Sequence, residues 1–205
     1  MEPLEESARP PSERTRVRRI PRRAAYDRAT IDAILDEALV CHLAFAVDGQ
    51  PYAIPTAFAR IDDHVYVHGA AASRMLRAAA GAPVCFTVTL VDGLVLARSA
   101  FHHSMNYRSV VALGPAEEVV DEAERLAAMR ALVERVAPGR WDQIRPPNRQ
   151  ELKATTILRL GLSECSAKTR TGPPIDDPED LALPCWAGVV PLALTRGAPV
   201  RDLTR

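Results

Sequence analysis

Several features are scarce in this sequence of 205 residues, and each absence narrows what the chain can do. The 26 basic and 26 acidic residues cancel to a formal net charge of zero, which argues against a nucleic acid as a partner. No apolar run approaches the length of a membrane span and no signal peptide precedes the domain, so we expect a cytoplasmic protein without a membrane partner. G-x-S-x-G, P-loop and G-x-G-x-x-G motifs are also missing, which argues against a hydrolase, a nucleoside triphosphatase and a Rossmann dehydrogenase.

Cysteine and lysine are rare as well. The four cysteines are widely spaced and include no C-x-x-C pair, as expected of reduced thiols rather than a disulfide framework. The only lysines are Lys153 and Lys168, because nearly all the basic residues are arginine. Either these two positions require the compact ammonium group of lysine, or the two lysines occur there by chance.

The composition is that of a globular protein with polar segments at both ends of the chain. Hydrophobic residues make up 47% of the chain, which is typical of a folded protein. Residues 1–24 are rich in Pro, Arg and Glu without an apolar period, and predict a flexible N-terminal arm. We expect one domain over residues 25–195, followed by a C-terminal tail over residues 196–205.

Hydrophobic periodicity predicts mainly strands, with a few helices between them. Asp27 can cap a helix over residues 28–39, and the capping-box pattern of Asp121 and Glu124 predicts a helix that runs to Val136. The inner face of this second helix is expected to comprise Leu126, Met129, Val133 and Val136. The Asp48-Gly49 and Asp92-Gly93 pairs predict turns. Strands are expected over residues 40–47, 50–61, 64–68, 83–90, 107–120, 152–163 and 186–194, with a further helix over 73–80. This order indicates an antiparallel closed or split barrel with helices.

A strand that stops at Gly69 is followed by small residues and then by Ser73-Arg74 at the start of a helix. Unpaired backbone N–H groups, a hydroxyl and a guanidinium at one helix start favour a phosphate. The same pair is also compatible with a plain helix cap followed by a surface arginine.

Histidines form the second group of candidate site residues. His68 ends a strand beside Gly69, where it can line a pocket or simply be a hydrogen-bonded residue at a strand end. His64 lies four residues earlier, so the two share a strand face and would supply half of a metal site. His102 or His103 would have to supply the third ligand, but the spacing matches no recognised metal motif and we predict no metal site.

Tyr107, Arg108 and Ser109 follow a polar loop at the start of a strand. They can line the same cavity as His68, or belong to an ordinary strand with an outward arginine. Trp141 and Trp186 can likewise cover a ring-shaped ligand or fill the core.

Several of these segments together resemble the pyridoxamine 5′-phosphate oxidase-like FMN-binding split barrels. The similarity is greatest to the branch that contains the nitroimidazole-resistance reductases and flavin-nucleotide-binding proteins. It covers about residues 25–195, and its most specific part lies within residues 98–111. The matching segments are residues 42–45, 52–58, 66–69, 73–74, 103–111, 151–155 and 166–168. The resemblance implies a mainly β fold, an antiparallel, Greek-key-like split barrel with flanking helices.

The resemblance also implies a homodimer that holds FMN in a groove at its interface. Ser73 and Arg74 would hold the FMN phosphate, while Tyr66, Val67 and His68 would run beside the flavin ring and the ribityl chain. The residues implied for the remaining contacts are Thr56 and Phe58 at the isoalloxazine, Tyr107 and Arg108 near the dimer interface, and Lys168 or Trp186 from the partner chain.

The function implied is that of an FMN-dependent oxidoreductase. NAD(P)H would reduce the flavin, a small organic acceptor such as a nitro compound or a quinone would be reduced in turn, and His68 would be the catalytic proton donor. Met75 follows Ser73-Arg74 where another basic residue is common, which argues against pyridoxamine phosphate as the substrate. The alternatives are the same fold with F420 or haem, the latter with a histidine as axial ligand, and a non-catalytic flavin-binding protein.

Overall fold

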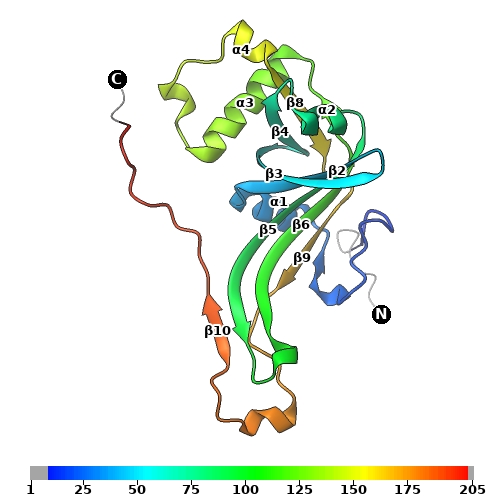
Figure 1. Cartoon of the computed structure of the whole chain (residues 1–205), viewed down its shortest axis with the longest axis vertical. Coiled ribbons are helices and arrows are strands. Elements are labelled where there is room, and N and C mark those ends of the chain that lie inside the picture. Colours follow the sequence, from blue (N-terminus) through cyan, green and yellow to red (C-terminus); the bar gives the residue numbers. More distant parts are fainter. Residues whose placement is uncertain (1–8, 203–205) are drawn as a thin grey trace. The chain divides into compact units, whose positions relative to one another are not determined.

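The computed structural model describes residues 9–202, which form two compact units (Figure 1). The first unit comprises the described residues up to Leu90 together with Arg108–Thr169. The second comprises Val91–Tyr107 and the chain from Arg170 onward. The single domain expected over residues 25–195 stays a prediction, and its residues belong to both units.

Antiparallel strands dominate the first unit, as predicted. Their hydrogen bonds follow the order β1-β9-β6-β5-β2-β3-β4-β8-β7. Asp48 and Gly49 both have positive φ, 50° and 81°, which is the backbone of a two-residue hairpin turn. The strands are β1 (Ala24–Ala25), β2 (Val40–Val47), β3 (Gln50–Ile61), β4 (His64–Ala70), β5 (Pro83–Leu96), β6 (Ser104–Pro115), β7 (Glu117–Glu118), β8 (Thr155–Gly161) and β9 (Cys165–Arg170).

Each of the four α-helices begins at a polar residue that accepts a hydrogen bond from the first turn. The caps are Asp27 for α1 (Arg28–Glu37), Ser73 for α2 (Arg74–Ala79), Asp121 for α3 (Glu122–Val136) and Asn148 for α4 (Arg149–Lys153). These side chains satisfy N–H groups that have no partner within the helix. Helix starts can therefore be read from the sequence, and α1, α2 and α3 confirm the predicted ones within a residue.

The core of the first unit lies between α1, α2 and the inner faces of the strands. Phe58 and Phe86 meet edge to face in it, with ring centroids 5.1 Å apart. A smaller cluster of Tyr66, Val119, Ala128 and Ile157 joins α3 to β4 and β8. This smaller cluster places α3 beside β4, near His68.

The second unit is built on the far part of β5, which pairs antiparallel with β10 (Gly188–Pro191). Asp176 accepts hydrogen bonds from the backbone and the guanidinium of Arg98, both at 2.7 Å. Buried Arg170 contacts Asn106 and donates to the carbonyl oxygens of Gly172 and Pro173. Side-chain hydrogen bonds thus organise the start of the Pro- and Asp-rich stretch over residues 170–184.

The predicted turn at Asp92-Gly93 is wrong, because β5 continues through it to Leu96. Gly93 pairs with Pro191 of β10, and a Cβ there would lie 2.9 Å from Val189 Cγ1. The glycine therefore permits a close approach of two strands rather than a reversal of the chain.

Other boundaries also differ from the prediction. The strand expected over residues 107–120 starts earlier, at Ser104, and is split into β6 and β7. The strand expected over 152–163 begins only at Thr155, since the capping box of Asn148 and Glu151 starts α4 just before it. The strand expected over 186–194 is limited to β10, and β9 was not predicted.

The inner face of α3 is rotated from the predicted one. Ala128 and Leu132 are its buried residues, whereas Leu126 and Val136 are exposed. The apolar stripe is wider than the contact with the sheet, so the remainder of the stripe, including Val133, lines a cavity.

Residues 9–24 belong to the expected N-terminal arm, and several of them contact the rest of the first unit. Ser12 Oγ donates to Glu164 at 2.5 Å, and the Val17 N–H donates to the Tyr26 hydroxyl at 2.9 Å. Thr15 is buried, and β1 adds to the edge of β9. Residues 1–8 and 203–205 lie outside the described residues, and residues 196–202 contain no helix or strand. Among the described helices, none has the length and apolar character needed to cross a membrane.

Candidate functional site

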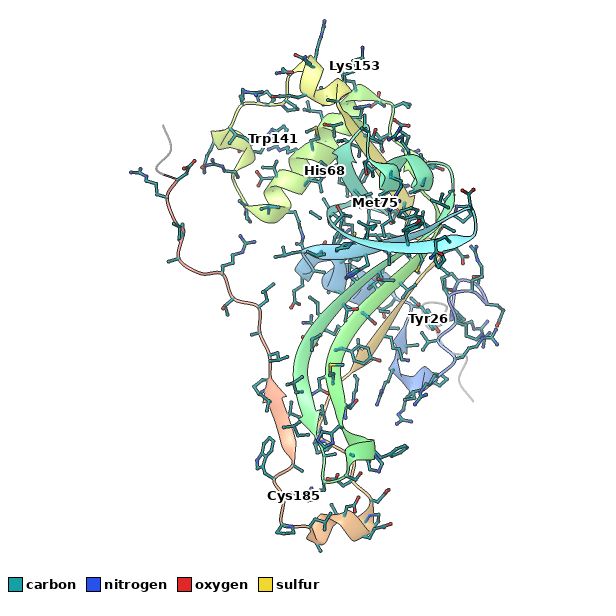
Figure 2. All side chains as sticks on the ribbon, viewed as in Figure 1. Tyr26, His68, Met75, Trp141, Lys153 and Cys185 are labelled. Carbon is teal, nitrogen blue, oxygen red and sulfur yellow. The ribbon has the colours of Figure 1, made fainter. Side chains whose placement is uncertain are left out.

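A cavity of about 280 Å³ lies in the first unit between β4 and α3, with His68 in its wall (Figure 2). His68 stands one residue before Gly69, and a Cβ at that glycine would lie 3.1 Å from Leu76 Cδ1. The other lining residues are Ala57, Met129, Leu132, Val133, Val136, Ala137 and Arg140. The lining is therefore apolar except for one imidazole and one guanidinium.

Two sets of polar contacts hold α3 against the barrel. The Tyr66 hydroxyl donates to Glu124 at 2.9 Å, and Arg159 donates to both oxygens of the same carboxylate. Burial and the neighbouring Glu124 carboxylate raise the pKa of Tyr66 to about 12, so this phenol remains a donor at neutral pH.

At the other end of α3, Arg135 donates to the carbonyl oxygens of Leu35, Asp36 and Ala38. These carbonyls lie at the C-terminal end of α1. The α3 wall of the cavity is thus fixed at both ends.

His68 is the chemically unusual group of this site. Its Nδ1 atom is buried and has no hydrogen-bond partner among the described residues. Burial lowers the pKa of His68, so the ring is neutral at physiological pH. A neutral imidazole with an unpartnered nitrogen in an apolar cavity can bind a metal centre or hydrogen-bond to a ligand.

The predicted phosphate pair lies at the start of α2. Ser73 Oγ accepts the N–H of Leu76 at 3.5 Å, which is a long capping bond. The Arg74 guanidinium stands over the ring of Tyr52, 4.6 Å from its centroid. Both residues therefore have local structural roles, and neither lines the His68 cavity.

Four predicted flavin contacts lie on β3 and β4, and they stay predictions. The side chains of Phe58, Tyr66 and Val67 are buried in the two cores of the isolated chain. Thr56 precedes Ala57 of the cavity, and strand alternation turns its side chain toward the other face of β3.

Arg108 and Lys168 also lie away from the cavity lining. Arg108 forms a two-point ion pair with Glu37 at the end of α1. Lys168 lies on β9 opposite Ala24, and its carbonyl oxygen accepts from Ser109. Tyr107 belongs to the second unit and is half-buried.

The remaining candidate histidines, His64, His102 and His103, do not line the His68 cavity. His64 lines a second, more polar cavity of about 430 Å³ with Tyr26, Arg28 and Asp63. In the second unit, His102 Nε2 lies 3.0 Å from Asp177, and His103 Nδ1 lies 2.9 Å from the carbonyl oxygen of Ser99. Within residues 9–202, no group of three or more His, Cys, Asp or Glu side chains is placed to hold a metal ion.

Sequence reasoning missed Met129, Leu132 and Arg140 as members of the site. Met129 carried a signal, because it belongs to the apolar stripe of α3, but the stripe predicts core packing equally well. Arg140 follows a Pro-Gly break and is one of many arginines, so nothing in the sequence distinguishes it.

Comparison with known proteins places the chain in a family. Residues 27–169 match the family described as pyridoxamine 5′-phosphate oxidase. The chain belongs to the pyridoxamine 5′-phosphate oxidase family. Membership confirms the expected fold, a mainly antiparallel split barrel with helices. No curated protein matches this sequence.

Three solved structures show the range of similarity within the family. The flavocytochrome Anf3 from Azotobacter vinelandii is 43% identical with a TM-score of 0.90, and the match covers 95% of this chain and 91% of that one. An FAD and haem binding protein from Mycobacterium smegmatis is 40% identical with a TM-score of 0.84, covering 88% and 89%. A proposed 5-nitroimidazole antibiotic resistance protein from Bacteroides thetaiotaomicron is 20% identical with a TM-score of 0.58, covering 71% and 85%, and supports the fold alone.

Proposed function

We propose that this protein is a redox protein that binds a flavin and a haem, with His68 as a ligand to the haem iron. The observation that carries the proposal is the neutral imidazole of His68 in the wall of an otherwise apolar cavity. Two relatives at 43% and 40% identity support it, since one is described as a flavocytochrome and the other as an FAD and haem binding protein.

The residues of the cavity fit a haem. The iron needs a neutral imidazole, and burial keeps His68 in that form. The macrocycle needs apolar surroundings, which Met129, Leu132 and Val133 of α3 supply. A bound haem would supply one-electron chemistry and a bound flavin two-electron chemistry. The chain itself would hold the iron through His68, and burial keeps this imidazole unprotonated.

The flavin of this proposal is FAD rather than the FMN that the sequence led us to expect, because the Mycobacterium smegmatis relative at 40% identity is described as an FAD and haem binding protein. Ser73 and Arg74 remain the proposed phosphate contacts, with the Arg74 guanidinium already positioned by Tyr52. Tyr107, Arg108 and Lys168 are proposed contacts only through a homodimer with the flavin at its interface. Sedimentation analysis tests this assembly, and a monomer at all concentrations in the presence of flavin contradicts it.

Absorbance of the purified protein tests the cofactors. We expect a Soret band after titration with haemin and flavin bands retained through desalting after addition of FAD. The Ser73→Ala/Arg74→Ala variant should lose affinity for FAD, whereas Arg77→Ala on the same short helix should not. Flavin bands without a Soret band would contradict the haem part, and would favour the expected NAD(P)H-dependent reduction of a small organic acceptor. Tight binding of F420 alone would contradict both cofactors.

A further inference from the structure

Arg140 is the only charged residue among those that line the His68 cavity. Its position follows from the way α3 ends. The helix stops at Val136, and Gly139 adopts a positive φ of 75°. The Arg140 N–H then donates to the carbonyl oxygen of Ala137 at 3.0 Å, which closes the turn at the cavity.

The loop that carries Arg140 is held by Glu134. The carboxylate of Glu134 accepts the N–H groups of Gly139 at 2.6 Å and of Trp141 at 2.8 Å. These two bonds lower the pKa of Glu134, so the carboxylate remains charged and the turn remains formed at neutral pH. Glu134 therefore fixes the backbone on both sides of Arg140 without forming an ion pair with its guanidinium.

The Arg140 guanidinium has spare hydrogen-bonding capacity. Its one side-chain contact is from Nη1 to Gln143 Oε1 at 3.2 Å, which is a neutral acceptor. Across residues 9–202, no carboxylate forms a salt bridge with it, in contrast to Arg130 and Asp142 nearby, which lie 3.6 Å apart. Because a guanidinium presents two parallel N–H groups, its best partner is a carboxylate.

The cavity thus combines an apolar wall, one neutral imidazole and one free cation. This combination suits a flat apolar ligand that carries a carboxylate at its edge. We propose that Arg140 binds a carboxylate of the ligand held by His68, and in this way sets the orientation of that ligand in the cavity. This inference rests on the proposed function, since a haem has propionate groups that supply the carboxylate.

The test compares haemin with its dimethyl ester, which has the same macrocycle but no carboxylates. Dissociation constants are measured from the Soret absorbance for the wild-type protein, Arg140→Ala and Arg140→Lys. We expect the wild-type protein to bind haemin about tenfold more tightly than the ester. Arg140→Ala should lose about the same factor for haemin and bind the ester unchanged, while Arg140→Lys falls between the two.

Arg130→Ala is the matched control, because Arg130 is an exposed arginine on α3 that does not line the cavity. It should bind both compounds as the wild-type protein does. Equal affinity of the wild-type protein for haemin and ester, or full haemin affinity in Arg140→Ala, would overturn the role of Arg140 and leave haem binding intact. Absence of a Soret change with either compound in the wild-type protein would overturn haem binding itself, and this inference with it.

Discussion

The two histidines of β4 lie four residues apart on one strand, yet they face different cavities. His64 lines the larger one, about 430 Å³, among Arg28, Asp63 and Tyr26. His68 lines the smaller one, about 280 Å³, among aliphatic side chains of α3. In the larger cavity, Arg28 already pairs with Asp32 and Asp63, at 2.9 Å and 3.2 Å. The comparison shows that the two histidines differ in their surroundings, because one lies among charged side chains and the other among aliphatic ones.

The largest effect on haemin affinity should come from replacing one of the two histidines and not the other. His68→Ala should weaken haemin binding at least about 100-fold, because the iron loses its protein ligand. His64→Ala should leave the affinity within about twofold, since its ring lies outside the cavity. Soret titrations of both variants measure the difference. Equal losses would show that the two cavities act as one site.

Substituting a tryptophan into each cavity in turn tests which of the two binds haemin. Val133→Trp places a large ring in the His68 cavity and should reduce haemin affinity about tenfold or more, while the free energy of unfolding changes by about 1 kcal/mol or less. Ser163→Trp does the same in the His64 cavity and should leave haemin binding unchanged. Urea unfolding of both variants controls for loss of structure. Unchanged haemin binding in Val133→Trp would place the ligand elsewhere.

Tyr66 lies between the two histidines and anchors α3. Tyr66→Phe removes the hydrogen bond to Glu124, and the free energy of unfolding should fall by about 1–2 kcal/mol. The loss is limited because Glu124 keeps its contacts with Arg159. Tyr52→Phe is the control, since no hydrogen bond of its hydroxyl is found among residues 9–202, and its stability should not change. Equal stability of both variants would contradict the anchoring role.

The smallest expected effect is on the pH dependence of stability, and it involves a third histidine, His102. The hydrogen bond to Asp177 raises the pKa of His102 above its ordinary value of 6.5, whereas burial lowers that of His68. The stabilisation from His102 is full below about pH 6.5 and is lost as the pH rises through the raised value. Chemical shifts of the two rings, followed by NMR, should therefore titrate on opposite sides of pH 6.5. The stability of His102→Gln should depend less on pH between 6 and 8, and an unchanged profile would contradict this assignment.

The sequence predicts those structural features, such as helix starts and hairpin turns, that are determined by neighbouring residues in the chain. Capping residues such as Asp27 and Asp121 place the helices, and the positive φ of Asp48-Gly49 is a property of that pair. The Asp92-Gly93 pair carries the same local signal, but pairing with Pro191, about a hundred residues later, overrides it. The burial of Phe58, a predicted flavin contact, likewise depends on a residue distant in the sequence, because its ring meets that of Phe86 edge to face.

The candidate site was only partly predictable. His68 could be selected because a strand ends there beside a glycine. That its ring lines a cavity with side chains of α3 depends on tertiary packing, and the sequence gives no measure of how far the apolar stripe of α3 extends past the sheet. Arg140 enters the site only because Glu134 fixes the loop around it.

Most of the aliphatic wall facing His68 comes from one helix, α3, which Asp121 caps and whose following loop is held by Glu134. The barrel core of α1, α2 and the inner strands does not include these side chains. Substitutions along one short stretch of the gene can therefore reshape the cavity while the barrel is preserved. We therefore expect the lining of this cavity to tolerate substitution in evolution without loss of the barrel.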